Sequence, residues 1–371
     1  QFQITGTDQQ VLFVMGAKGL ADKTGHVDNL KMSGRLTNLT QAPQGNVTLD
    51  IEGLSFSDLS VTSLTLVAEG NMQQVAFSGK AGGRYKSDFE IAASGHVISL
   101  QEGQRLNLDQ LNGQFGGSIL ALNRATQIKH SANGWGFEPF VLNLDQGNIQ
   151  GSGNCMDGML DVSIKFEDIP LEALQFAGLP RLDGKAAGSI DVSGPNSHPQ
   201  GGIILRLDRA GFRDGQYREF PPSVLQAKAD LKNVTIHADI TLEGLADRPL
   251  ELMIKAPFKF SLSPFIWAVP PKGKLRGRLA GALDLAHVFL FVGLPNQNLD
   301  GQMEIDLSLD GTAGDPRIRG YTRIQDGVYE NFRSGTFLKD AELDIAANNS
   351  RLVVERGRMS DGESGTISLQ G

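Results

Sequence analysis

Cysteine is nearly absent from this sequence: Cys155 is the only one in 371 residues, so no disulfide can form within the chain. An oxidising compartment is therefore neither required nor excluded. Cations are also in the minority, because 34 Lys and Arg stand against 42 Asp and Glu and give a formal net charge of −8. Nucleic-acid binding depends on cations that neutralise phosphates, so this charge balance disfavours it.

Long hydrophobic runs are missing as well. The longest nearly apolar stretch, 285–294, is too short for a bilayer span, which needs about 20 residues. No export signal is visible at the start, and the last residues, 366–371, stop inside an alternating pattern. Both ends therefore look cut from a longer polypeptide, and we expect any membrane anchor or export signal to lie outside this sequence.

Catalytic and cofactor motifs are not recognisable either. The six histidines are far apart and show no metal-ligand spacing. There is no nucleophile elbow, phosphate loop or dinucleotide fingerprint. The glycine-rich stretch 79–83 lacks the helix that should follow a phosphate-binding turn. We therefore expect a protein that is not an enzyme and has no cofactor and no metal site.

What the sequence has in quantity is alternation of apolar and polar residues. In 233–243 (NVTIHADITLE) every second residue is apolar, and the pattern recurs at 47–52, 160–167 and 303–310. A period of two is typical of a β-strand with one dry and one wet face, whereas a helix would spread these residues around its circumference. The dry face is predicted to include Leu160, Val162, Ile164, Phe166, Val234, Ile236, Ile240, Leu242, Met303, Ile305, Leu307 and Leu309.

Such runs follow one another along most of the chain and predict an all-β fold. They are separated by clusters of Gly, Asn, Asp and Ser, which are typical of turns, and Asn133-Gly134 and Asp157-Gly158 are hairpin signals. The periodicity supports three arrangements equally. These are two sheets packed as a sandwich, a wound solenoid with a dry core, and a sheet curled into an open groove that holds apolar ligands.

Three short segments, 170–178, 262–269 and 284–292, have apolar residues at helical spacing or on nearly every side and are predicted to be helices. The first and third open an internal repeat. Gly178-Leu179-Pro180 and the later Asp214–Tyr217 recur as Gly293-Leu294-Pro295 and Asp326–Tyr329, at offsets of 293 − 178 = 115 and 327 − 215 = 112. Between them, Asp183-Gly184 and Pro199 recur as Asp300-Gly301 and Pro316. The repeat predicts an elongated array divided into 1–168, 169–283 and 284–371.

One charged pattern stands out in this acidic chain. The cations of 272–278 alternate with Gly and Leu, so on a strand all of them would point the same way: Lys272, Lys274, Arg276 and Arg278. Two interpretations stay open. The row is either a solvated edge guarded against aggregation or a basic rim for an anionic headgroup or a partner protein.

From about residue 100 onward the sequence resembles the TamB branch of the AsmA-like proteins, and the earlier part matches that family only in style. The resemblance is carried by PLEAL at 170–174 ahead of a Gly-Leu-Pro and an Asp-Gly, and by Asp-Gly-x-Tyr at 326–329 followed by Phe332. It is also carried by LVVER at 352–356 ahead of Asp361-Gly362, and by the Gly-rich strand ends of 108–153.

The resemblance implies a β-taco, which is an elongated, rolled, mainly antiparallel sheet with an apolar groove and a few short helices. Proteins of this family lie in the periplasm and are anchored in the inner membrane by a helix. Their partners are phospholipids and an outer-membrane barrel of the Omp85 class (TamA or BamA). The implied function is a bridge-like carrier that shields phospholipid acyl chains between the two membranes. The alternative is a scaffold that guides outer-membrane proteins during assembly by strand pairing at its sheet edge.

Overall fold

The computed structural model describes residues 2–7, 9–173, 182–212, 221–262, 265–292, 296–349 and 351–371. The described chain is almost entirely β-strand, as the alternation predicted, and its sheet strands pair antiparallel. It divides into two compact units, Gln1–Pro180 and Arg181–Gly371. The boundaries expected at 168/169 and 283/284 stay predictions.

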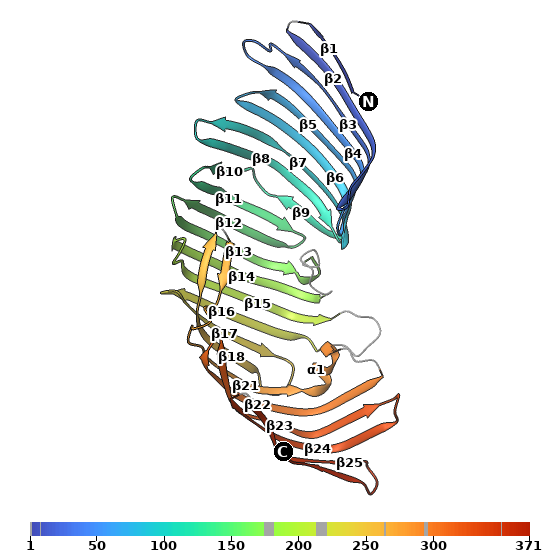
Figure 1. The fold of residues 1–371 in the computed structure, drawn as a ribbon, viewed down its shortest axis with the longest axis vertical. Helices are drawn as coiled ribbons and strands as arrows, with labels where there is room; N and C mark the ends of the chain where they lie inside the picture. The colour runs from blue at the N-terminus through green and yellow to red at the C-terminus, as the bar shows by residue number, and fades with distance from the viewer. Residues whose placement is uncertain are drawn as a thin grey trace. The chain divides into compact units, whose positions relative to one another are not determined.

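The first unit is a ladder in which nearly every strand pairs with the next one along the chain (Figure 1). β9 and β10 are the exception: both lie between β8 and β11 and share one position in the ladder. The long strands bend along their length in Figure 1. The strands are β1 (Phe2–Thr7), β2 (Gln10–Ala21), β3 (Gly25–Thr37), β4 (Gln44–Phe56), β5 (Leu59–Asn71), β6 (Gln74–Tyr85), β7 (Ser87–Leu100), β8 (Gly103–Phe115), β9 (Ser118–Leu122), β10 (Thr126–Ser131), β11 (Gly134–Leu144), β12 (Gly147–Met156) and β13 (Met159–Pro170).

The second unit continues the same design. Its sheet strands are β14 (Leu182–Pro195), β15 (Gln200–Phe212), β16 (Ser223–Lys232), β17 (Thr235–Glu243), β18 (Leu250–Pro257), β21 (Arg276–Asp284), β22 (Gln297–Thr312), β23 (Asp315–Asn331), β24 (Thr336–Asn349), β25 (Arg351–Ser360) and β26 (Thr366–Leu369). Between β18 and β21, which pair directly, the chain forms a separate hairpin of β19 (Lys259–Leu262) and β20 (Phe265–Ala268). The helix α1 (Leu285–Val292) follows β21.

The three predicted helices have different outcomes. The third is confirmed as α1, which begins after Asp284, whose carboxylate accepts a hydrogen bond from the backbone N of Ala286 at 2.9 Å. The second is wrong, because Leu262 ends the strand β19 and Phe265–Ala268 form the strand β20. Pro264 disfavours a helix interior, and a short apolar run does not distinguish helix from strand. For the first, Pro170 ends β13, residues 171–173 form a 3₁₀ turn, and the rest of 170–178 lies outside the described residues.

The internal repeat is visible in the strand registers of the second unit. Ala186 faces Leu207 in the β14–β15 pair as Met303 faces Ile324 in the β22–β23 pair, and the offset is constant: 303 − 186 = 117 and 324 − 207 = 117. Each pair has a bulge at an Asp-Gly, where Gly184 and Gly301 have φ of 114° and 124°. These positive φ values favour glycine at both positions.

The offset of 117 confirms the alignment of Asp183-Gly184 with Asp300-Gly301 and corrects the offset of 112 expected at Asp326-Gly327. At this offset Asp326 corresponds to Arg209, since 326 − 209 = 117, and both have φ of 51°. Aligning Asp326-Gly327 with Asp214-Gly215 was therefore misleading. Residues 214–217 lie outside the described part of the chain, as do Phe220, 178–180 and 293–295.

Candidate functional site

The registers place the apolar residues of the second unit on one face of its sheet. Directly opposed residues of an antiparallel pair lie on the same face. Ile240 of β17 lies opposite Leu252 of β18, which lies opposite Leu279 of β21, which lies opposite Leu307 of β22. From β17 to β22, the rows of opposed residues on either side of this one also consist of apolar residues or glycine. The face is therefore a continuous apolar surface from strand to strand.

The predicted residues of this unit mostly lie on that face. Ile305 is buried, and the half-buried members are Ile236, Ile240, Leu242, Met303, Leu307 and Leu309. Val234 does not lie on a strand: with Asn233 it forms the β16–β17 turn, its φ is 53° and its side chain is 37% exposed. The strand predicted from residue 233 therefore begins two residues later, because both turn residues adopt the left-handed conformation typical of tight hairpins.

In the first unit, the four predicted residues of β13 share one face with the apolar partners of β12. Leu160 is buried opposite Cys155, and Phe166 is half-buried opposite Ile149. Val162 and Ile164, also half-buried, lie opposite glycines of β12. That the apolar faces of the two units form one continuous groove stays a prediction.

Aromatic rings lie over glycines on this face, a feature that sequence periodicity did not reveal. Phe137 of β11 lies opposite Gly153 of β12, and a Cβ added to Gly153 would lie 2.5 Å from Cε1 of the ring. Phe13 and Gly34 form the same kind of pair between β2 and β3, where the added Cβ would lie 2.6 Å from Cζ. The missing side chain lets the ring lie across the neighbouring strand.

No second sheet packs on the apolar face of either unit within the described residues. The elements in extended contact there are neighbours in a sheet, the two strands of the β19–β20 hairpin, and α1 with β21 and β22. A sandwich would require extended contact between strands that are not sheet neighbours. The described part of the chain therefore does not support that alternative.

The helix α1 covers part of the apolar face in the second unit. Its Val288 packs against a buried cluster of Leu245, Leu283 and Ile305. Nδ1 of His287 lies 3.2 Å from the carbonyl oxygen of Leu245, so this histidine is hydrogen-bonded to the backbone ahead of β18. Ile305 is therefore covered by the chain itself and is not accessible to a ligand.

The opposite face of the second unit carries ion pairs. The guanidinium of Arg278 donates two hydrogen bonds to the carboxylate of Asp306, at 3.1 and 2.9 Å. Asp344 lies between Arg323 and Arg356, with oxygen–nitrogen distances of 2.8 and 2.9 Å. These hydrogen bonds, with the charges of the arginines, hold the pKa of Asp306 and of Asp344 below the ordinary carboxyl value.

The predicted basic row has two different parts. Arg276 and Arg278 lie on β21, on the face opposite the apolar one, and Arg278 is neutralised by Asp306. Lys272 and Lys274 precede the strand, and Lys274 forms an isolated bridge with Thr312. The predicted row therefore consists of one neutralised arginine, Arg278, and three other exposed cations near the start of β21.

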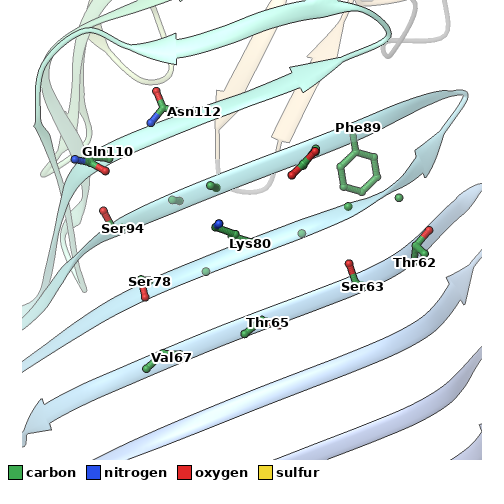
Figure 2. Close-up of a pocket in the computed structure, with 17 residues that line it drawn as sticks. Thr62, Ser63, Thr65, Val67, Ser78, Lys80, Phe89, Ser94, Gln110 and Asn112 are labelled. Atoms are coloured by element: carbon green, nitrogen blue, oxygen red, sulfur yellow. The ribbon is translucent and has the colours of Figure 1, made fainter.

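A hollow of the first unit lies on its polar face. It encloses about 790 Å³ over β5 to β8 and is lined by small and polar side chains, among them Thr65, Lys80 and Asn112, which Figure 2 shows around it. A smaller hollow of about 220 Å³, lined by residues such as Leu64, Leu66 and Phe77, lies on the apolar side of the same strands. The apolar face there is therefore a shallow surface and not a deep pocket.

Comparison of the chain with protein-family models, with curated proteins and with solved structures finds no match. None of the described helices is long and apolar enough to cross a membrane. The candidate site therefore rests on the geometry of the two apolar faces alone.

Proposed function

We propose that this chain is a segment of a periplasmic, bridge-like carrier that shields phospholipid acyl chains on the apolar faces of its sheets. The supporting observation is the row of apolar side chains that runs from strand to strand without a second sheet over it in the described residues. The sequence resemblance to TamB-like proteins supports the same function. It also suggests passage between the inner and outer membranes and docking, through regions outside this sequence, to an Omp85-type barrel.

The physical basis of this function is the transfer of hydrocarbon from water to an apolar surface. Each acyl CH₂ removed from water contributes about 0.8 kcal/mol. Because Leu, Ile, Val and Ala occupy equivalent positions on successive strands, neighbouring positions on the face differ little in affinity. A lipid tail can then move from strand to strand over low barriers, and no side chain has to perform chemistry.

The helix α1 would limit such movement where it covers β21 and β22. Since Val288 and the buried cluster occupy this part of the face, lipid would pass beside α1 or after its displacement.

The position of α1 also decides which substitutions on the apolar face are informative. Ile305→Arg would disrupt a buried cluster and the fold, whereas Ile240 and Ile236 are half-buried on β17, away from that cluster.

The test is a phospholipid transfer assay between donor and acceptor vesicles with two matched variants. Ile240→Asp places a charge on the apolar face, and Thr241→Asp places the same charge on the opposite face of the same strand. We expect Ile240→Asp to abolish transfer and Thr241→Asp to retain it, with both variants folded by circular dichroism. Equal transfer by the two variants would reject the proposed face. Transfer by neither variant nor the unsubstituted chain, with crosslinks to unfolded outer-membrane proteins instead, would favour the scaffold function.

A further inference from the structure

The stretch from 252 to 283 is the most basic part of this acidic chain. It contains no Asp or Glu, whereas the whole chain has a net charge of −8. Its cations are Lys255, Lys259, Lys272, Lys274, Arg276 and Arg278. A concentration of one sign of charge in a chain of the opposite sign indicates a local surface for an anionic partner.

Most of these cations are not neutralised by any carboxylate in the part of the chain that the structure describes. Arg278 is paired with Asp306. The other five are exposed, and none has an ion pair with a carboxylate of the described residues. The acids of the adjoining β22–β23 turn are occupied elsewhere: Asp310 pairs with Arg319 at 3.2 Å, and Asp315 pairs with Arg317 at 3.4 Å.

The same stretch contains the β19–β20 hairpin, which is not part of the main sheet. Figure 1 shows its two orange-yellow strands running across the direction of β14 to β18. Within the described residues its strands have extended contact only with each other. The hairpin is therefore an appendage of the sheet.

The base of the hairpin is firmly anchored. Phe258 is 2% exposed, and its backbone N donates to the carbonyl of Val234 at 2.9 Å, in the β16–β17 turn. On the return side, Gly273 accepts a hydrogen bond from the backbone N of Ala313 at 3.0 Å, in the β22–β23 turn. Lys272 and Lys274 flank this second anchor. The hairpin therefore leaves the sheet from a fixed base with cations beside it.

The hairpin is rich in large apolar residues: Phe260, Leu262, Phe265, Ile266, Trp267 and Val269. The side chains of Ile266 and Val269 are 42% and 40% exposed. Apolar residues that include Trp, next to Lys and Arg, form the combination that binds the interface of an anionic bilayer. The apolar groups enter the headgroup region while the cations attract the lipid phosphates.

We propose that the β19–β20 hairpin, with the five cations in and beside it that have no ion pair among the described residues, docks this protein onto the surface of a bilayer that contains anionic phospholipids. This inference does not rest on lipid transfer along the apolar faces, and either can fail without the other. An acidic protein partner would use the cations but would leave the apolar residues of the hairpin in water.

The first experiment is co-sedimentation of the full chain with vesicles of phosphatidylcholine alone or with about a third phosphatidylglycerol. We expect binding to the anionic vesicles only, weakening as salt rises. Each cation near such a surface contributes about fivefold to binding. Lys272→Ala, Lys274→Ala and Arg276→Ala together should therefore weaken binding about 100-fold. The matched control Lys18→Ala, Lys31→Ala and Lys80→Ala removes three exposed cations of the first unit that have no ion pair with a described residue, and it should leave binding unchanged.

The second experiment reports insertion through Trp267. Trp135 and Trp267 are the only tryptophans, so Trp135→Phe leaves one reporter. We expect its emission to shift to shorter wavelength with anionic vesicles and to be quenched by brominated lipid. Phe265→Ser with Ile266→Ser should abolish both effects. No binding to anionic vesicles would overturn the proposal. Binding without quenching would also overturn it, because the hairpin would then not enter the bilayer. An equal loss of binding with the control triple variant would overturn it as well, because the cations near the hairpin would then be no more important than cations elsewhere.

Discussion

At the scale of single residues, the pairing of an aromatic ring with a glycine shapes the apolar face. Phe137 lies over Gly153, and the space for a Cβ at Gly153 is taken by the ring. We predict that Gly153→Ala lowers the free energy of unfolding by about 1–3 kcal/mol, because the ring must move from its place. Urea unfolding measures this change.

A double-mutant cycle tests whether the ring of Phe137 causes the loss of stability in Gly153→Ala. In a Phe137→Ala background, Gly153→Ala should cost nothing, because the clash is removed. Gly82→Ala is the control: its added Cβ would lie 3.7 Å from the nearest atom, so stability should be unchanged or slightly higher. Equal costs of Gly153→Ala in both backgrounds would show that the ring is not the cause.

The carboxylate of Asp344 gives a prediction for acid stability. The hydrogen bond from Arg323, together with the charges of Arg356 and Arg323, holds the pKa of Asp344 below its ordinary value of 3.8 in the folded state. The unfolded chain therefore binds this proton first, and the stabilisation is present above pH 3.8 and lost as the pH falls through the folded pKa. We predict that Asp344→Asn is less stable than the unsubstituted chain at pH 7 and that the difference shrinks in this acid range. A difference that grows on acidification, in urea unfolding at several pH values, would contradict the assignment.

Single residues also show how much of the apolar face can be predicted from the sequence. Period-two alternation correctly predicted that Ile236, Ile240 and Leu242 share one face. It failed at Val234, because a hairpin turn that uses an apolar residue continues the alternation without continuing the strand. The Gly–aromatic pairs were not predictable, since they depend on which residues of neighbouring strands face each other, and register is a tertiary property.

At the scale of elements, α1 depends on its cap. The Asp284 carboxylate accepts the backbone N–H of Ala286 at 2.9 Å, one of the donors that a helix start leaves unpaired. We predict that Asp284→Ala destabilises the α1 region by about 1 kcal/mol, while Asp284→Asn, which keeps an acceptor oxygen, loses much less. Faster amide hydrogen exchange in α1, with unchanged exchange in β23 and β24, is the expected measurement. Equal exchange in both variants would mean that packing of Val288 alone holds the helix.

Elements also explain one error made from the sequence. The segments 262–269 and 284–292 are both short and apolar, yet the described residues of the first include the strand β20 and the second contains the helix α1. Composition could not separate them, because short helices and strands of this kind are decided by what surrounds them. A second signal was available: Pro264 stands near the start of the first segment, where a helix would lose a hydrogen bond, whereas Asp284 is the first residue of the second, at a capping position.

At the scale of the whole molecule, the repeated sheet unit and the alignment of its first Asp-Gly were predictable, whereas the alignment of its second Asp-Gly was not. The Asp-Gly bulges and the turns at Pro199 and Pro316 recur at 117 residues. The sequence alignment followed a second Asp-Gly that lies elsewhere in the first copy. The all-β, antiparallel design was also predictable, because one pattern is copied along the chain. Whether hydrocarbon occupies the apolar faces depends on the partners of the protein, which a pattern cannot specify.

The most direct test of the central claim is photocrosslinking in cells from two neighbouring positions of β17. A photoreactive amino acid at Ile240 samples the apolar face, and the same group at Thr241 samples the opposite face. The account predicts phospholipid adducts at position 240, identified by mass spectrometry, and none at position 241. Equal lipid labelling at both positions, or only protein adducts at position 240, would contradict it.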